Sequence, residues 1–215
     1  MSYSKEDLRD LYDGRLPWHK TFEIMSKPKD DDRFDKYVEI LQERVSYPER
    51  ILMPLGDHLN VVQKGAERIV KCDCGHEFGD WRQNWKLNAL IFARDDTEKL
   101  EEVYPGLKSP DPDLCEVREF YCPGCGSLLM VEALPVGCPL IFDVLPDLDS
   151  FYREWLGRPL PDEKEFRDMT YGVTGEWGRD LEWRPNSGAG FCVTARCWKA
   201  FRLVSESPRS LLRGI

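Results

Sequence analysis

The hydrophobic pattern of residues 1–50 has a helical period. Ser4 is a suitable N-cap for a short helix that ends at Gly14, and Pro17 can begin a second helix. A third helix is predicted after the acidic run 30–32, because the apolar positions that follow lie on one helical face. These positions are Phe34, Tyr37, Val38, Leu41 and Val45. We interpret this stripe as a face that packs on the protein itself, and partner binding is the alternative.

From residue 51 the pattern changes to short apolar runs separated by turns, which is typical of strands. The predicted strands are residues 59–63, 68–71, 88–93, 116–121 and 128–133. The first two flank Lys64 and Gly65 and form a hairpin. Residues 97–104 read as a short capped helix between strands, and residues 147–155 as a later helix that stops at Gly157.

Two cysteine pairs lie beside predicted strand ends, and a glycine follows each pair. Cys72 and Cys74 are separated by one residue, and Cys122 and Cys125 by two. Four thiolates presented from two tight turns are what a tetrahedral zinc ion requires. The glycines can adopt the positive φ of such a turn and leave an amide free to face sulfur. The sequence therefore predicts a structural zinc site with these four cysteines as ligands.

Other interpretations of the cysteines stay open. The gap within the first pair is shorter than the common zinc-finger spacing. His76 could replace one cysteine, although four cysteines already complete the shell. The four could also be ordinary buried thiols. Cys122 and Cys125 match the spacing of a redox dithiol, but such a pair opens a helix after a strand, whereas residues 128–133 read as a strand.

Together these elements predict an α+β fold with a zinc-ribbon-like β core, in which the metal joins two hairpins at their tips. The predicted fold also contains N-terminal helices, a helical insertion and a C-terminal helix plus extension. We expect a helical segment at 1–50, the zinc-ribbon-like domain at 51–135, a second helical segment at 136–165 and an extension at 166–215. The extension is too apolar to be freely solvated, so we expect the zinc domain or, preferably, a partner to cover it. Its apolar residues include Phe191, Val193, Trp198, Phe201, Leu203 and Val204.

Charge and residue inventory disfavour several classes of function. The 215-residue chain has a formal net charge of −9 and a pI near 5.0, which disfavours nucleic-acid binding because phosphate contacts need clustered Lys and Arg. No apolar run suits a signal peptide or a membrane span, so we expect a cytoplasmic protein. With three histidines and no phosphate-loop, dinucleotide or nucleophile-elbow motif, we expect no catalytic residue in this chain.

The segment 81–86 combines two tryptophans with polar residues. Aromatic side chains with Arg between them are common at protein interfaces, which is one interpretation of this segment. The alternative is that Trp81 and Trp85 fold back over the first cysteine pair as a small core. Both interpretations stay open.

Several stretches resemble the small γ subunit of acetone carboxylase and the related small subunits of ATP-dependent ketone carboxylases. They are 37–44 (YVEILQER), 51–56 (ILMPLG), 72–76 (CDCGH), 80–87 (DWRQNWKL), 121–126 (YCPGCG) and 151–157 (FYREWLG). They occur in the family's order and cover about residues 1–165. The resemblance ends near Pro161, beyond which the chain continues as the extension.

The resemblance implies a division of labour between subunits. In that family, large hydantoinase-like subunits use ATP to activate bicarbonate and the ketone, and form the carbon–carbon bond at their own metal site. The γ subunit holds a structural zinc. For this chain the resemblance implies zinc ligation by all four cysteines, large partners in a hetero-oligomer, and ATP and the catalytic metal only in those partners. The main alternative is a free-standing zinc-ribbon adaptor for protein or nucleic acid, and a dithiol oxidoreductase is a third.

Overall fold

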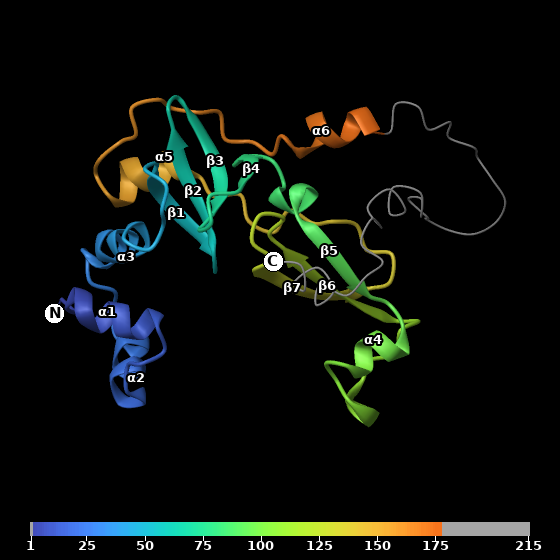
Figure 1. The fold of residues 1–215 in the computed structure, drawn as a ribbon. Helices are drawn as coiled ribbons and strands as arrows, with labels where there is room; N and C mark the ends of the chain where they lie inside the picture. The colour runs from blue at the N-terminus through green and yellow to red at the C-terminus, as the bar shows by residue number, and fades with distance from the viewer. Residues whose placement is uncertain (1, 178–215) are drawn as a thin grey trace.

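The computed structural model describes residues 2–177 (Figure 1). The apolar positions predicted to be covered, between residues 191 and 204, lie outside the described residues. The described chain combines helices with two antiparallel sheets, which confirms the predicted α+β class. Figure 1 shows the two sheets beside each other, with α1 and α2 at one end of the molecule.

The two sheets have simple strand orders. The four-stranded sheet has the order β1-β2-β3-β4, and the three-stranded sheet has the order β5-β6-β7. The strands are β1 (Arg50–Gly56), β2 (Leu59–Lys64), β3 (Glu67–Cys72), β4 (Glu77–Asp80), β5 (Leu90–Arg94), β6 (Cys115–Tyr121) and β7 (Leu128–Pro135). All five predicted strands are therefore present with slightly shifted ends, and β2 and β3 form the predicted hairpin.

The sequence pattern predicts neither β1 nor β4, and each has a physical reason to escape it. β1 lies at the edge of its sheet, where Pro54 costs no ladder hydrogen bond. Its register with β2 shifts twice, so its side chains do not alternate regularly. β4 is four residues long and contains Gly79 at a φ of 98°. In both strands the alternation of buried and exposed side chains continues over too few residues to be recognised in the sequence.

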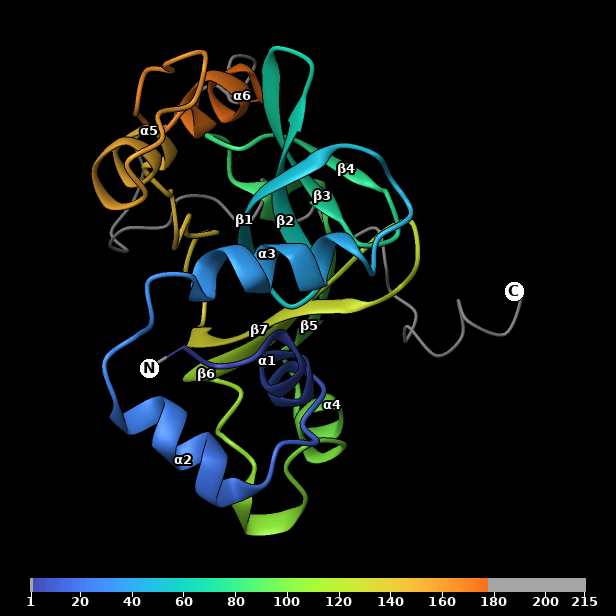
Figure 2. The same cartoon turned by 90° about the vertical axis from the view of Figure 1, so that its left-hand side faces the viewer.

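The N-terminal helices pack on the protein itself. They are α1 (Lys5–Tyr12), α2 (Trp18–Ser26) and α3 (Arg33–Gln42). The Ser4 hydroxyl caps α1 by accepting a hydrogen bond from the Asp7 amide at 3.0 Å, as predicted. α3 lies along β1 (Figure 2), and its Leu41 joins a buried cluster with Ile51 and Ile69. The interpretation of the α3 stripe as an intramolecular face is confirmed.

The remaining helical elements are short. They are the 3₁₀ turn Trp85–Asn88, α4 (Thr97–Glu101), the 3₁₀ turn Gly106–Lys108, α5 (Leu148–Ser150), the π-helical turn Phe151–Trp155 and α6 (Thr170–Trp177). The predicted helix at 147–155 is thus present, but its second half is wider than an α-helix. It stops where Gly157 adopts a φ of 63°. None of the described helices has the length and apolar character needed to cross a bilayer.

The main buried cluster takes side chains from both sheets and from the segment that links them. Trp81 and Trp85 are 2% and 8% exposed, and the Trp85 ring centroid lies 5.9 Å from those of Phe78 and Phe120. The interpretation in which these tryptophans fold back as core is confirmed. The interface interpretation is wrong for the two tryptophans, because burial in their own chain leaves almost no indole surface for a partner.

Buried ion pairs attach both sheets to the segment that follows β7. Arg68 of β3 donates two hydrogen bonds to the Asp149 carboxylate, at 2.7 and 2.8 Å. Lys86 pairs with Glu132 of β7 and with Asp143. A charge is tolerated in the interior only when it is paired and hydrogen-bonded. These contacts therefore fix the path of the chain after β7 against the two sheets.

Candidate metal centre

The first cysteine turn connects β3 to β4. Cys72 is the last residue of β3, and its amide donates a hydrogen bond to the His76 carbonyl at 2.8 Å. The Gly75 amide donates to the Cys72 carbonyl, also at 2.8 Å. Gly75 has a φ of 96°, the positive φ predicted for the glycine of this turn. The chain therefore reverses tightly around Cys74, which is exposed.

The second cysteine turn connects β6 to β7. The Cys122 amide donates to the Ser127 carbonyl at 2.9 Å, and the Gly126 amide donates to the Cys122 carbonyl at 2.8 Å. Gly126 has a φ of 72°, again as predicted. The Gly124 amide donates to Cys122 Sγ at 3.4 Å, which is the amide-to-sulfur contact typical of a metal-binding turn.

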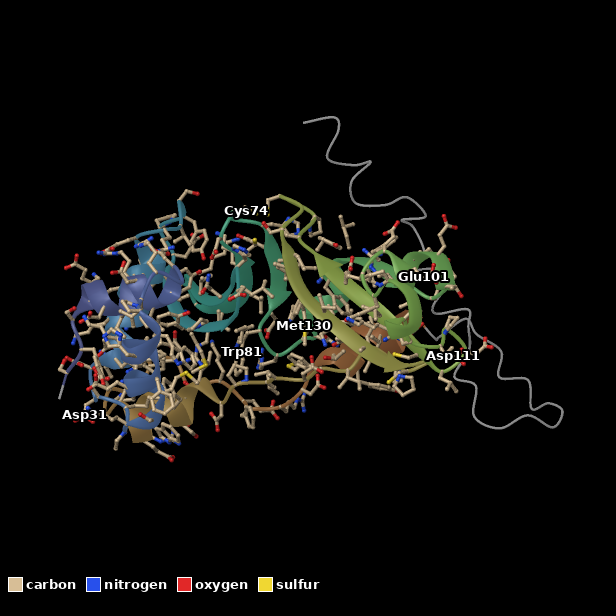
Figure 3. The ribbon with its side chains drawn as sticks, turned by 90° about the horizontal axis from the view of Figure 1, so that it is seen from below. Asp31, Cys74, Trp81, Glu101, Asp111 and Met130 are labelled. Atoms are coloured by element: carbon tan, nitrogen blue, oxygen red, sulfur yellow. The ribbon has the colours of Figure 1, made fainter. Side chains whose placement is uncertain are left out.

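The two turns meet and bring all four thiols together. The Sγ atoms of Cys72, Cys74, Cys122 and Cys125 all lie within 4.8 Å of one another. Cys72 Sγ lies 3.8 Å from Cys125 Sγ, and Cys74 Sγ lies 3.7 Å from Cys122 Sγ, so each close pair joins one turn to the other. Figure 3 shows Cys74 where the four-stranded sheet approaches the three-stranded sheet.

The spacing of the sulfurs suits a tetrahedral metal ion. Metal–sulfur bonds of about 2.3 Å in a regular tetrahedron place neighbouring sulfurs about 3.8 Å apart. The two cross-turn separations of 3.7 and 3.8 Å agree with that value, and all separations are within 4.8 Å. Four soft thiolate donors in this geometry are the donor set that favours zinc. The residues present therefore fit the predicted ion.

Burial and crowding affect the charge of the thiols. Burial raises the pKa of Cys72 well above its usual range and raises the pKa of Cys122 to about 11. Burial also acts to raise the pKa of Cys125, but hydrogen bonds with Ser127 and with other cysteines lower it to about 7. Thiols this close together lose all their protons only when a cation neutralises the thiolates. Without a cation, the raised pKa values keep Cys72 and Cys122 protonated.

The two turns lie close together at Gly124. A Cβ at this position would lie 2.9 Å from His76 Cβ and 3.3 Å from Cys74 Sγ, so a larger residue would push the turns apart. The His76 ring stands edge-on to Phe78, with centroids 5.0 Å apart. In the described part of the chain, the group of potential ligand atoms contains the four cysteines and not His76. His76 contributes packing and its carbonyl.

The redox interpretation requires a setting that the second turn does not have. A dithiol of this spacing acts from the first turn of a helix that follows a strand. Cys122 and Cys125 instead lie between two strands of one sheet, β6 and β7. The geometry of this pair is therefore that of a metal-binding turn.

Sequence patterns miss a polar network behind the first turn. The Asp73 carboxylate, between the first two cysteines, accepts a hydrogen bond from Asn60 Nδ2 at 2.8 Å and lies 3.0 Å from His58 Nδ1. The sequence feature that could have indicated this network is Asp73 itself, a residue with a hydrogen-bonding side chain in the unusually short spacer between Cys72 and Cys74. That signal does not reveal its partners, because both belong to a neighbouring strand and its preceding turn.

The fold and the site together define a class of protein: an α+β protein whose zinc-ribbon-like core gathers four thiols from two turns. Comparison with known families is more specific. The family model described as acetone carboxylase gamma subunit matches residues 45–156. The chain belongs to this family, and the resemblance noted in its sequence is confirmed.

Two curated relatives extend this finding. The acetone carboxylase gamma subunit of Xanthobacter autotrophicus is 44% identical over 167 residues, which cover 77% of this chain and 99% of that protein. The acetophenone carboxylase beta subunit of Aromatoleum aromaticum is 31% identical over 112 residues, which cover 51% of this chain and 80% of that protein. Both names describe subunits of carboxylases. This chain belongs to the same gamma-subunit family.

Proposed function

We propose that this chain is the structural, zinc-binding and non-catalytic subunit of an ATP-dependent ketone carboxylase. In the assembled enzyme, acetone and bicarbonate would form acetoacetate. Large hydantoinase-like subunits would bind ATP and hold the catalytic metal. This chain would supply a folded zinc centre and contact surface to the assembly.

The observation that carries this proposal is the four-thiol cluster in a member of this family. Four sulfur ligands fill a tetrahedral shell and leave no position for a water molecule or a substrate. An ion held in this way stabilises the fold and does not act as a Lewis acid. Zinc would therefore link β3–β4 to β6–β7 and so hold the two sheets in one arrangement.

The choice of substrate rests on the two relatives. The relative named for acetone is 44% identical and is matched over almost its whole length, whereas the relative named for acetophenone is 31% identical over a shorter part. This difference favours acetone, or a ketone of similar size, over an aromatic ketone. The large subunits would determine the choice, because they would hold the reacting groups.

An exposed apolar stripe on α2 supports assembly with another protein. Trp18, Phe22 and Met25 are 71%, 59% and 65% exposed, and they follow one another at spacings of four and three residues. The opposite face of the helix buries Ile24 at 3% exposure. Neighbouring exposed apolar side chains of this size are typical of protein–protein contact sites.

Co-expression of this chain with large hydantoinase-like chains encoded by neighbouring genes tests the proposal. The full chain should co-elute with them in size-exclusion chromatography, and the complex should carboxylate acetone in the presence of ATP. Each large chain expressed alone is the control. A zinc-loaded chain that stays monomeric beside soluble large partners would contradict the proposal and favour a free-standing adaptor.

A further inference from the structure

The first cysteine turn has a shorter spacer than the second, yet it delivers both thiols to the same cluster. One residue, Asp73, separates Cys72 from Cys74, whereas metal-binding turns usually have two to four residues between ligands. The chain leaves β3 and turns at Asp73. The orientation of this residue therefore sets the direction of both neighbouring thiols.

Asp73 is held by three contacts to the start of β2 and the turn before it. Its amide donates to the His58 carbonyl at 3.0 Å, which extends the β2–β3 ladder beyond the pair Leu59 and Cys72. Its Oδ1 accepts from Asn60 Nδ2 at 2.8 Å, and its Oδ2 lies 3.0 Å from His58 Nδ1. The backbone amide and both carboxylate oxygens of Asp73 therefore all contact β2 or the turn before it.

The residues that hold Asp73 are themselves fixed. Asn60 is 2% exposed, and its Nδ2 also lies 3.4 Å from the Tyr47 hydroxyl. His58 has a φ of 64° and is the single non-glycine residue with positive φ in the described part of the chain. A left-handed conformation is unfavourable for a residue with a Cβ, so compensating contacts are needed to retain it. The contacts of His58 with Asp73 are such compensation.

We propose that Asp73 is a positioning residue of the metal centre, which His58 and Asn60 hold so that the short turn presents both of its thiols to one ion. The second turn achieves the same end with its own backbone, through the Gly124 amide and the Cys122 sulfur. The first turn has backbone hydrogen bonds of its own and is held in addition by side chains outside it. This inference rests on the proposed metal centre, because positioning has meaning only if the thiols bind an ion.

The full-length chain with Asp73→Ala tests the inference. We expect zinc transfer to a chromogenic chelator to become about 10- to 100-fold faster, as is usual when an outer partner of a ligand is removed. The cobalt(II) form should show altered d–d and sulfur-to-cobalt absorption, because its coordination geometry relaxes. Asp73→Asn keeps the size and part of the hydrogen bonding, so it should restore most of the parent spectrum.

The matched control is Asp57→Ala, in the same turn as His58, where the side chain is exposed. It should leave zinc transfer within about twofold of the parent. His58→Gly keeps the left-handed backbone conformation and deletes the imidazole. It should speed zinc transfer less than Asp73→Ala does, and add nothing in the double variant because Asp73→Ala already removes the carboxylate that His58 contacts.

The outcomes separate this inference from the proposed function. A parent chain that binds neither zinc nor cobalt would contradict the metal centre and, with it, this inference. A parent that binds zinc while Asp73→Ala keeps the same transfer rate and the same cobalt spectrum would overturn only the role of Asp73. Reduced thermal stability of the variant with unchanged metal binding would also overturn it, because Asp73 would then support the fold alone.

Discussion

The two cysteine turns differ in spacer length and in the contacts that hold them. The first, between β3 and β4, has a one-residue spacer and contacts side chains of a neighbouring strand and turn. The second, between β6 and β7, has a two-residue spacer and is fixed mainly by its own backbone. The second turn therefore carries its geometry in its local sequence. The first also has backbone hydrogen bonds of its own, but the contacts that hold its Asp73 form only when β2 has paired with β3. Two cysteine pairs of the same chemistry can thus be held in different ways, one by contacts within its own turn and the other also by contacts with β2.

This difference has a consequence for folding and for metal loading. The second turn can present its thiols once β6 and β7 pair. In the first, Asp73 contacts Asn60 of β2, the strand that pairs with β3, and His58 of the turn before β2. A metal ion bound by the four cysteines would join hairpins from two separate sheets, so its binding would be coupled to docking of the sheets.

Loss of a buried ligand should have the largest effect. Cys122→Ser removes a thiol that is fully buried in the core. In finger peptides the binding free energy of structural zinc is about 10–16 kcal/mol, and it contributes directly to folding. We expect the variant to lose bound zinc and most of its cooperative thermal transition, measured by metal analysis and calorimetry. Cys74→Ser, at the exposed cysteine, should retain more order, and equal losses would show that burial of the thiol does not decide the size of the effect.

Removing the acidic partner of Arg68 should have the next largest effect. The Arg68 side chain is 1% exposed, so Asp149→Ala would leave its charge buried and unpaired. We expect a loss of about 3–5 kcal/mol in the free energy of unfolding, measured by denaturant titration of the zinc-loaded chain. Glu163→Ala is the control, because its pair with Arg153 is exposed and should contribute little. A small loss in the free energy of unfolding of Asp149→Ala would show that the stability of the chain does not depend on the pair of Arg68 and Asp149.

The same pair predicts a dependence on pH. Burial acts to raise the pKa of Asp149, but hydrogen bonds from Arg68 and from the Lys164 amide lower it below its usual value. Its stabilising contribution is therefore complete above the ordinary carboxyl pKa of about 3.9 and is lost as pH falls through the lowered value in the folded state. Acid titration of Asp149→Ala should show a shallower loss of stability than the parent in this range. Parallel curves would contradict this assignment.

The glycines of the two turns should respond differently to alanine. At Gly124 a Cβ would lie 2.9 Å from His76 Cβ, so Gly124→Ala should force the turns apart and weaken metal binding. At Gly75 the space is open but φ is 96°, so Gly75→Ala should cost about 1–2 kcal/mol of backbone strain. Zinc transfer rates and denaturant titrations separate steric from conformational effects. Identical behaviour of the two variants would show that close approach at Gly124 is unimportant.

The smallest effect on stability is expected on the surface of α2. Phe22 is 59% exposed, so Phe22→Ser should change the free energy of unfolding by less than about 0.5 kcal/mol. Co-elution with the large chains should weaken in the same variant. Trp155→Ser is a matched control, because it also removes an exposed aromatic side chain but lies elsewhere on the molecule. Equal weakening in both would argue against a specific role of the α2 stripe.

The sequence predicts those parts of the molecule whose determinants are local. The N-cap at Ser4, the turn glycines Gly75 and Gly126, and the hairpin of β2 and β3 depend on residues a few positions apart. The stripe on α3 is likewise a periodic signal. These features follow from backbone geometry and hydrophobic spacing, and they determine the fold class and the proximity of the cysteines.

Features that depend on tertiary contacts do not follow from the sequence in the same way. The burial of Trp81 and Trp85 depends on Phe120 from the other sheet. The contacts of Asp73 depend on the register of β2 with β3. Both are decided by which strands meet, and a single sequence contains no direct signal for that pairing.

X-ray absorption of the purified full-length chain, together with metal stoichiometry, tests the central claim most directly. The account predicts close to one zinc per chain, surrounded by four sulfur atoms at about 2.3 Å. Chelation of that zinc should lower the thermal stability of the same sample. A chain that is isolated without metal and does not gain stability when zinc is added would contradict the account.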